Sequence, residues 1–345
     1  MNTATTPQRH RDDAVALDTG LDVVTGAFSY SGKAIAEALL GAGRQVRTIT
    51  GHPGRAPEGS PIEVRPLDFD NPVGLVESLA GATTLYNTYW VRFAHGRTDH
   101  DVAVANSRAL FHAARRAGIR RIVHVSITHP GIDSPFAYFR GKALVERALA
   151  EVDVSYAIVR PAILFGGDGV LLNNIAWLLR HLPVFAVGGR GGYRVRPVHV
   201  DDLAQLCVAR GAERQDSVTD AVGPERPMFI ELVRDIRDAI DSRARIVCVP
   251  GPAVPVFSRL VGMALRDVLL TADEYRAMAA GLADTDGPAS APTALSGWIA
   301  QHASELGLHY ANELNRHYRE SPPAPLVGAA PDRSVPAGGV EGRTT

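Results

Sequence analysis

Short apolar runs alternate with longer amphipathic segments between residues 20 and 160. The apolar runs have the length of buried strands, and the segments that follow show the 3.6-residue period of helices packed on one face. The expected strands are residues 21–25, 45–50, 62–66, 83–88, 121–126 and 155–160, and the expected helices are residues 33–40, 99–117 and 136–151. This succession predicts an α/β fold with a doubly wound parallel sheet and helices on both of its faces.

The regular alternation ends after residue 160. Residues 165–196 are rich in glycine, aromatic and apolar side chains, whereas residues 198–209 return to the earlier pattern. From residue 224 onward the sequence favours helices, with one strand near residues 245–249. We therefore expect a second, smaller C-terminal domain, built from two insertions, that caps the sheet and shapes a substrate pocket.

The resulting domain limits are specific. The expected parts are a flexible tail at 1–18, a sheet domain at 19–164 and 197–223, a smaller capping domain at 165–196 and 224–320, and a second flexible tail at 321–345. The two tails are assigned from their polar or Pro-, Gly- and Ala-rich composition.

The segment VTGAFSYSGK, residues 24–33, links the first expected strand to the first expected helix. Gly26 permits a tight turn, and Gly32 lets the helix pack closely on the sheet, so that free N–H groups of the helix face a pyrophosphate. Ser29 stands where the usual dinucleotide pattern has a glycine, and its hydroxyl is a candidate donor that compensates for the lost close approach. An ordinary turn without a ligand is the alternative.

A nicotinamide dinucleotide site often has an acidic residue near the end of the second strand, where it binds the ribose hydroxyls. Residues 44–57 contain no acid and carry four basic or imidazole side chains, of which Arg47, His52 and Arg55 are the candidate contacts. This favours the 2′-phosphate of NADP(H), with NAD(H) as the alternative, and solvated surface arginines are the competing interpretation. Asp68, after the third strand, is a candidate contact for the adenine edge.

Lys33 and Lys142 are the only lysines among 36 basic residues. Lys142 follows Tyr138 by four residues in an expected helix, which places both side chains on one face. A nearby ammonium stabilises tyrosinate and lowers the phenol pKa, so that Tyr138 exchanges a proton near neutral pH. Ser126, at the end of the fifth strand, is a candidate to orient the reacting oxygen, with Thr128 or a simple capping role as alternatives.

Composition limits the remaining function classes. The 36 basic and 37 acidic residues give no electrostatic footprint for nucleic acid. Cys207 and Cys248 lie among apolar residues and predict buried thiols in a reducing cytoplasm, and no metal-ligand spacing occurs. The first 18 residues do not resemble a signal peptide, and residues 253–270 are too charged to span a bilayer, although peripheral membrane contact through residues 255–270 is a third, weaker hypothesis.

Taken together, these motifs resemble the extended and atypical short-chain dehydrogenase/reductases, including epimerase/dehydratase-like and NmrA-like proteins. The resemblance rests on Gly26 with Gly32, Tyr138 with Lys142, the Arg160-Pro161 and Phe165-Gly166 pairs, and the segment VHVDDLA at 198–204. The resemblance looks closest to the branch that includes the nucleotide-binding accessory subunit of respiratory complex I, and the segment LPVF at 182–185 supports that placement. The resemblance covers roughly residues 20–250 and implies a Rossmann fold.

The same resemblance implies a set of ligand contacts. The cofactor-binding residues it implies, together with the loop and basic residues, are Gly26, Phe28, Ser29, Tyr30, Gly32, Arg47, His52, Arg55, Asp68, Lys142 and Pro161, and the catalytic ones are Tyr138, Lys142 and Ser126. We expect an NADP(H)-dependent oxidoreductase, or an epimerase working through transient oxidation, that acts on a small molecule the sequence does not name. The alternative is a nucleotide-binding scaffold or redox-sensing partner without turnover. No pattern indicates an oligomeric state.

Overall fold

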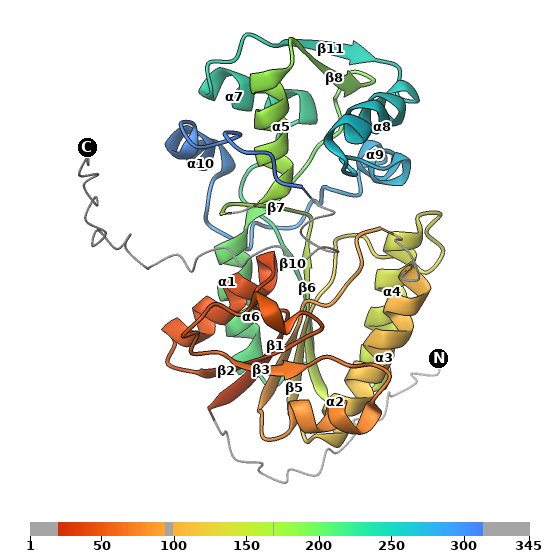
Figure 1. Cartoon of the computed structure of the whole chain (residues 1–345). Helices are drawn as coiled ribbons and strands as arrows, with labels where there is room; N and C mark the ends of the chain where they lie inside the picture. The colour runs from red at the N-terminus through yellow and green to blue at the C-terminus, as the bar shows by residue number, and fades with distance from the viewer. Residues whose placement is uncertain (1–19, 94–98, 168, 313–345) are drawn as a thin grey trace, which may run out of the picture.

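The computed structural model describes residues 20–93, 99–167 and 169–312. They form two lobes, a lower one built on a parallel sheet and an upper one built mainly of helices (Figure 1). The expected tails lie outside the described residues. No helix in the described ranges is both long and apolar enough to cross a membrane.

The lower lobe contains seven parallel strands. They are β1 (Leu21–Thr25), β2 (Gln45–Thr50), β3 (Glu63–Pro66), β4 (Thr84–Asn87), β5 (Arg121–Val125), β6 (Ser155–Pro161) and β10 (Ser217–Ala221). Their order across the sheet is β10-β6-β5-β4-β1-β2-β3. The order reverses between β1 and β4, and ligands of open α/β sheets bind at such a switch point, outside the carboxyl ends of the strands. The expected doubly wound Rossmann sheet is confirmed.

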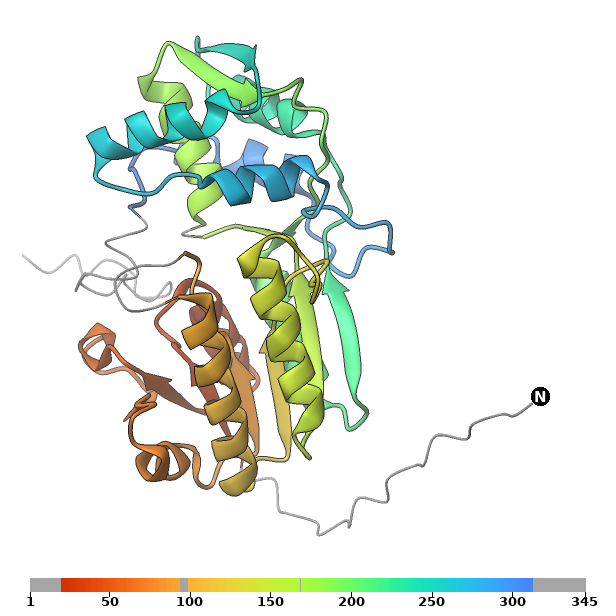
Figure 2. The same ribbon diagram turned by 90° about the vertical axis from the view of Figure 1, so that its right-hand side faces the viewer.

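Helices cover both faces of this sheet. One face carries α1 (Tyr30–Gly41) and α6 (Val200–Ala212), and the other carries α2 (Pro72–Leu79), α3 (His100–Arg116) and α4 (Ala137–Glu151). Figure 2 shows α3 and α4 side by side along the second face. Each face has its own apolar core, centred on Ile35 and Leu39 beneath α1 and on Leu110 and Phe111 beneath α3. The sequence pattern missed α2 and β10.

The upper lobe is assembled from separate stretches of chain. Its elements are α5 (Val170–His181), β8 (Val184–Gly188), α7 (Phe229–Ala239), β11 (Arg245–Val249), α8 (Ala253–Leu265), α9 (Ala272–Ala279) and α10 (Leu295–His302). A third apolar core lies inside it, with Phe165, Leu172 and Leu232 fully buried. The short pair β7 (Ile163–Phe165) and β9 (Pro197–His199) lies where the chain passes between the lobes.

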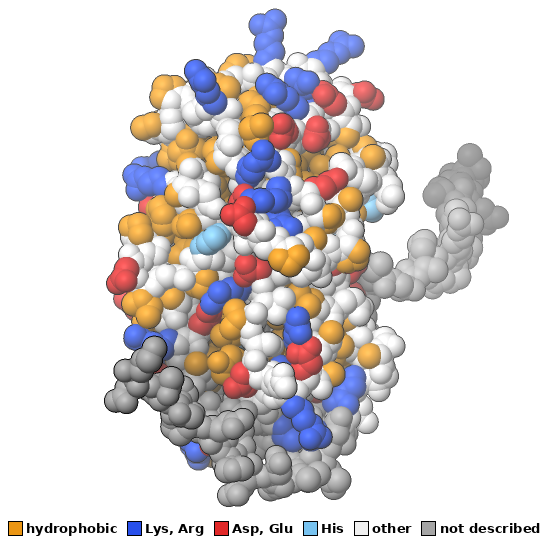
Figure 3. Space-filling view, turned by 180° about the vertical axis from the view of Figure 1, so that it is seen from behind, with side chains coloured by type: hydrophobic (Ala, Val, Ile, Leu, Met, Phe, Trp, Pro, Cys, Tyr) orange, Lys and Arg blue, Asp and Glu red, His pale blue; other side chains and the backbone are white. Residues whose placement is uncertain are grey.

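One detail differs from the sequence-based expectations. Cys207 is buried as expected, but Cys248 is exposed, because β11 lies in a two-stranded sheet with one open face. The cap of α6 is His199, whose ring accepts the N–H of Asp201, whereas the Asp202 carboxylate accepts the N–H of Thr293 in the upper lobe. On the face shown in Figure 3, basic and acidic side chains are interspersed, and basic ones gather at the end of the upper lobe.

Arg196 connects the crossing segments. Its buried guanidinium donates to the carbonyl oxygens of Gly223, Thr285 and Gly287, of which the first two lie 3.0 and 2.8 Å away. All three acceptors belong to chain that passes between the lobes. Arg194, two residues earlier, is exposed and donates to the Arg226 carbonyl.

We expect Arg196→Met to destabilise the fold strongly, because it leaves buried carbonyl groups without a donor. The loss in free energy of unfolding is roughly 3 kcal/mol or more, seen as a fall in Tm in thermal unfolding. Arg194→Met is the matched control and is expected to change Tm little. Equal Tm values for the two variants would contradict this role for Arg196.

Candidate functional site

The loop between β1 and α1 has the geometry of a phosphate cradle. Gly26 has φ +62°, which favours glycine, and a Cβ on Gly32 would lie 2.2 Å from the Gly26 carbonyl oxygen. Only glycine fits at position 32, so α1 begins directly against the end of β1. Residues 28–31 line the cleft, and the first N–H groups of a helix have no acceptors within it. This cradle fits a dinucleotide pyrophosphate.

Ser29 closes the loop from inside. Its backbone is extended, with φ −96° and ψ 167°, and this conformation does not require glycine. Its hydroxyl donates to the Gly26 carbonyl at 2.6 Å and not toward the cleft. The expectation that this hydroxyl compensates by facing phosphate is therefore not met in this structure.

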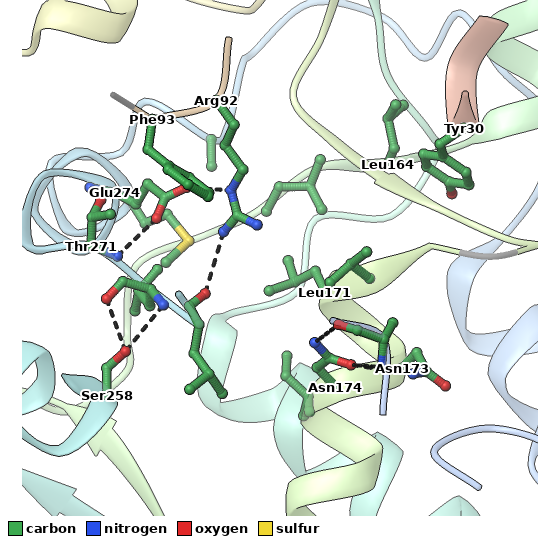
Figure 4. A pocket seen from close by; sticks show the side chains of 18 of the residues that line it. Tyr30, Arg92, Phe93, Leu164, Leu171, Asn173, Asn174, Ser258, Thr271 and Glu274 are labelled. Carbon is green, nitrogen blue, oxygen red and sulfur yellow. Dashed lines mark hydrogen bonds and ion pairs between the residues drawn. The ribbon is translucent and has the colours of Figure 1, made fainter. Parts of the chain in front are cut away.

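Tyr30 joins the loop to the second lobe. Its phenol donates to the Gly166 carbonyl at 2.7 Å, and a Cβ on Gly169 would lie 2.7 Å from the phenol oxygen. Figure 4 shows Tyr30 beside Leu164 at one end of the cleft. The phosphate cradle and the segment that leads into the upper lobe are thus held together by one side chain.

The basic residues predicted to select NADP(H) separate into two groups. Arg55 lines the cleft, and burial lowers its pKa. Arg47 lies in the middle of β2, where Glu63 binds it at 2.8 Å and the carbonyl groups of Ser78 and Ala80 accept its other N–H groups. Its guanidinium is held by the lower lobe, so the structure does not bring it to the cleft.

Three other predicted contacts also lie apart from the cleft surface. His52 is exposed, with its N–H bonded to the Thr50 hydroxyl. Asp68 is exposed, and its carboxylate accepts the N–H of Asp70, which makes it part of a local turn. Pro161 is buried, and its carbonyl accepts the N–H of Thr128. Phe28, in contrast, lines the cleft beside Ser29 and Tyr30.

Lys142 is buried and only 3% exposed. Its ammonium donates to the Val125 carbonyl at 2.9 Å and lies 4.8 Å from the centre of the Trp90 ring. Burial lowers the pKa of Lys142 to about 7, partly offset by the nearby Glu146 carboxylate. Lys142 is therefore charged only part of the time at neutral pH.

Tyr138 lines the same cleft. Burial raises the pKa of its phenol, the Glu274 carboxylate raises it further, and Arg92 opposes the change. The expectation that Lys142 lowers the phenol pKa is wrong for this structure. The physical reason is desolvation, which disfavours tyrosinate, and the phenol is neutral at physiological pH.

The Trp90 indole packs on α4 and lies next to both of these side chains. A Cβ on Gly141 would lie 2.7 Å from it, so only glycine leaves room for the ring. The indole meets the Tyr138 ring edge-on at 5.7 Å and stacks on His100 at 5.7 Å. The spacing of Tyr138 and Lys142 in the sequence does not predict this contact, because Trp90 comes from the segment that follows β4.

Several buried polar atoms near Trp90 and the end of β5 have no hydrogen-bond partner. In the described ranges, the buried atoms without a hydrogen-bond partner include Trp90 Nε1, His100 Nδ1, His124 Nε2 and Ser126 Oγ. Native proteins rarely leave such atoms unsatisfied, and a ligand or bound water usually completes them. Ser126 follows β5 directly and its Oγ has no hydrogen-bond partner, but the residue is only 4% exposed and is not among those that line the cleft.

A buried polar chain at the sheet switch point was not anticipated. Thr25 donates to the Asn87 side chain at 3.3 Å, and the Asn87 amide lies 3.0 Å from His124 Nδ1. Burial and the nearby Lys142 hold the pKa of His124 well below its usual range, so its imidazole is neutral. The available signal was a polar residue at the end of each of three apolar strands. No described group of three or more His, Cys, Asp and Glu residues is placed to hold a metal ion.

The cleft between the lobes is one cavity of about 1900 Å³. The phosphate loop and Arg55 lie at its lower side, Tyr138 lies on α4, and α5, α8 and α9 supply the upper side. Arg92 crosses toward the upper lobe, where it binds Glu274 at 2.7 Å and the Leu269 carbonyl at 3.3 Å (Figure 4).

Comparisons with known proteins agree with this geometry. Residues 26–174 match a family described as NAD(P)H-binding. The mitochondrial NADH dehydrogenase (ubiquinone) 1 alpha subcomplex subunit 9 of Arabidopsis thaliana is 26% identical over 66% of this chain and 60% of its own length. The rat protein of the same name is 30% identical over 39% of this chain and 37% of its own length. The chain thus spans less than two thirds of these relatives.

Solved structures show the same fold. A nucleoside-diphosphate-sugar epimerase from Staphylococcus aureus has a TM-score of 0.67 at 18% identity, covering 81% of this chain and 99% of its own. An NADPH-dependent quinone oxidoreductase from Escherichia coli, complexed with NADPH, has a TM-score of 0.66 at 20% identity, covering 83% and 99%. Residues 26–174 thus match an NAD(P)H-binding family, and with the cradle at Gly26 and Gly32 and this shared fold the chain is similar to the extended, NmrA-like short-chain dehydrogenase/reductases.

Proposed function

We propose that this protein is an NADP(H)-dependent reductase that acts on a carbonyl group. The observation that carries the proposal is that the phosphate cradle and the Tyr138 side chain line one continuous cavity. A dinucleotide whose pyrophosphate lies at the N-terminus of α1 extends along the carboxyl edge of the sheet. This direction leads from β1 past β4 to the end of β5 and to Tyr138 on α4.

Arg55 is the residue that favours the phosphorylated cofactor. It follows β2, where the adenosine ribose of a Rossmann dinucleotide lies, and it lines the cavity. A guanidinium forms strong charge-assisted bonds with phosphate. Arg47 and His52 take no part in this proposal, since they lie away from the cavity surface, and Asp68 is exposed in a turn.

The protonation states favour reduction. When bound, the nicotinamide supplies a hydride to the carbonyl carbon. Tyr138 then donates its proton to the carbonyl oxygen, and the raised pKa keeps the phenol protonated for this step. An epimerase that starts by oxidising an alcohol needs a base at the same place, which a phenol with a raised pKa supplies poorly. Ser126 Oγ, buried and without a partner, is the donor that orients the oxygen.

One observation favours a second candidate function, nucleotide binding without turnover. The Lys142 ammonium lies against the Trp90 ring and donates to the Val125 carbonyl, and no hydrogen bond to Tyr138 is seen in the described part of the chain. Two relatives are named as subunits of a mitochondrial NADH dehydrogenase. Under this alternative, NADPH raises Tm by binding only the folded state, but no carbonyl compound is reduced.

We expect Arg55→Ala to weaken NADPH binding by about 10- to 100-fold, equivalent to about 1–3 kcal/mol for a charge-assisted contact. NADH affinity is expected to change little, because NADH lacks the 2′-phosphate. Calorimetric titration with both nucleotides measures this, with Arg65→Ala on exposed β3 as the matched control. Equal losses for NADPH and NADH would contradict the assignment.

Tyr138→Phe keeps the ring and its contacts with Trp90 and His100 but removes the acid. We expect the rate on a carbonyl compound that the wild type reduces to fall by roughly 100-fold or more, the usual size of an acid–base contribution. Thermal unfolding with NADPH checks that binding survives, and Tyr193→Phe in the upper lobe is the control. A wild-type rate in Tyr138→Phe would exclude the phenol as the acid.

The low pKa of Lys142 predicts a pH dependence of stability. The unfolded chain keeps this lysine protonated up to about pH 10.5, whereas the folded chain releases the proton near pH 7. Between these values the unfolded state binds more protons, so the free energy of unfolding rises with pH. Relative to Lys142→Met, the wild type should gain about 1 kcal/mol per pH unit from pH 7.5 to 9, measured by urea unfolding. Parallel curves for the two proteins would refute it.

A further inference from the structure

The upper part of the cavity is lined mainly by apolar side chains. They come from α5, β8, β11, α8 and the segment around α9, and they include Leu171, Leu178, Val247, Phe257, Val261 and Met278. Figure 4 shows Leu171 facing this space. An apolar cavity of this kind gains most from a ligand with a large apolar surface.

Polar side chains on the α5 side are bonded within the protein. The Asn174 amide exchanges two bonds with the backbone of Ala311, at 2.9 and 3.0 Å. Asn173 donates to the His309 carbonyl at 2.8 Å and accepts the Gly307 N–H at 3.1 Å. These amides are directed to the chain that follows α10, which leaves the apolar side chains of α5 to a ligand (Figure 4).

On the side formed by α8 and α9, polar side chains are also hydrogen-bonded within the protein. Ser258 donates to the Leu270 carbonyl at 2.8 Å and accepts the Leu270 N–H at 3.0 Å. Thr271 and Glu274 form a reciprocal cap at the start of α9, and Glu274 also binds Arg92. The polar groups of both sides therefore satisfy each other instead of presenting donors to the cavity.

The charges that line the cavity favour an apolar ligand over a sugar nucleotide. The basic side chains that line the described cavity are Lys33, Arg55 and Arg92. The first two lie at the phosphate loop and the adenosine side, and Arg92 is paired with Glu274. The upper side also carries the carboxylates of Glu305 and of Asp273, the latter paired with Arg276 at 3.2 Å. The upper side therefore offers a second diphosphate carboxylates and ion-paired arginines.

The outer surface of α8 continues the apolar lining to solvent. Val256, Phe257, Leu260 and Met263 are 50–60% exposed, and Phe257 also lines the cavity. Arg259 and Arg266 are exposed on the same helix segment. An apolar helix face flanked by basic side chains suits a bilayer surface with anionic lipids.

From these observations we propose that the substrate is a carbonyl compound with a long or polycyclic apolar body, which passes from a lipid bilayer into the upper lobe beside α8. The apolar body lies among the side chains of α5, β8 and α8, and its oxygen lies at Ser126 and Tyr138. The chemistry of this step rests on the proposed reductase function, whereas the binding of the apolar body does not. One carbonyl would take up a hydride from NADPH, which becomes NADP⁺, and a proton from Tyr138, which regains a proton from water, and an alcohol leaves.

Binding is tested with the full chain and Nile red, a neutral apolar dye whose emission reports its surroundings. We expect saturable binding that 1-hexadecanol displaces and that 1-butanol and UDP-glucose do not. Leu171→Trp fills the cavity and should weaken dye binding by about 10-fold, while the rise in Tm with NADPH is retained. Val73→Trp, exposed on α2, is the matched control and should bind as the wild type does.

Displacement of the dye by UDP-glucose, or equal dye binding in Leu171→Trp and the wild type, would overturn the assignment of the cavity. If Leu171→Trp loses the NADPH-dependent rise in Tm, Leu178→Asn on the same helix replaces it, with the same expected weakening of dye binding.

Turnover is tested with NADPH and hexadecanal in phosphatidylcholine vesicles containing phosphatidylglycerol, compared with butanal. We expect kcat/KM to be at least on the order of 100-fold higher for hexadecanal, because each buried methylene contributes about 0.8 kcal/mol. Equal values would overturn the apolar substrate while leaving the reductase intact. Dye binding without reduction of either aldehyde would instead overturn the reductase and leave the apolar site.

The entrance is tested with Leu260→Asp and Met263→Asp on α8, with Val73→Asp as the control. We expect both α8 variants to lose association with the anionic vesicles in a sedimentation assay and to bind Nile red as the wild type does. Association equal to that of Val73→Asp would overturn the proposed contact between α8 and the bilayer.

Discussion

The absence of a side chain at Gly32 is the constraint on which the site depends. A Cβ there would overlap the Gly26 carbonyl oxygen, so any larger residue would move α1 away from the end of β1. The close approach directs the N-terminus of α1 at the switch point between β1 and β4. Tyr30, on the first turn of this helix, then reaches the Gly166 carbonyl. The position of one glycine thus sets both the anion site and the link to the segment that leads into the upper lobe.

The chemistry on α4 depends on a second close approach. Gly141 admits the Trp90 indole, which excludes water from Lys142 and covers one side of Tyr138. Desolvation then acts in opposite directions on the two groups, lowering the pKa of the ammonium and raising that of the phenol. Both changes favour the neutral forms. The pair consequently differs from one in which a charged lysine stabilises tyrosinate.

The sheet, its helices and the loop at Gly26 and Gly32 could be predicted because strand and helix periods and glycine geometry are local properties of sequence. The helix α2 was missed because Pro72 and Gly74 interrupt its pattern, although Asn71 before Pro72 is a capping signal. Burial of Tyr138 and Lys142 could not be derived from their spacing, since Trp90 is supplied by another strand. Arg47 was assigned by its charge alone, and its pairing with Glu63 depends on the register between β2 and β3.

Tyr138 lines the cavity, and buried polar atoms without partners, the Ser126 hydroxyl among them, lie near the ends of β4 and β5. On the lower side of the cavity, glycine geometry and a helix terminus suit phosphate; on the upper side, amide, hydroxyl and carboxylate groups are largely bonded to the protein itself. In the complex we propose, the ligand has its polar atoms near Ser126 and Tyr138 and an apolar remainder in the upper lobe. Burial of an uncharged remainder would stabilise that complex, and the Ser126 hydroxyl would orient the single oxygen. Under this proposal the upper lobe sets the affinity, and the lower lobe sets the position of the reacting oxygen.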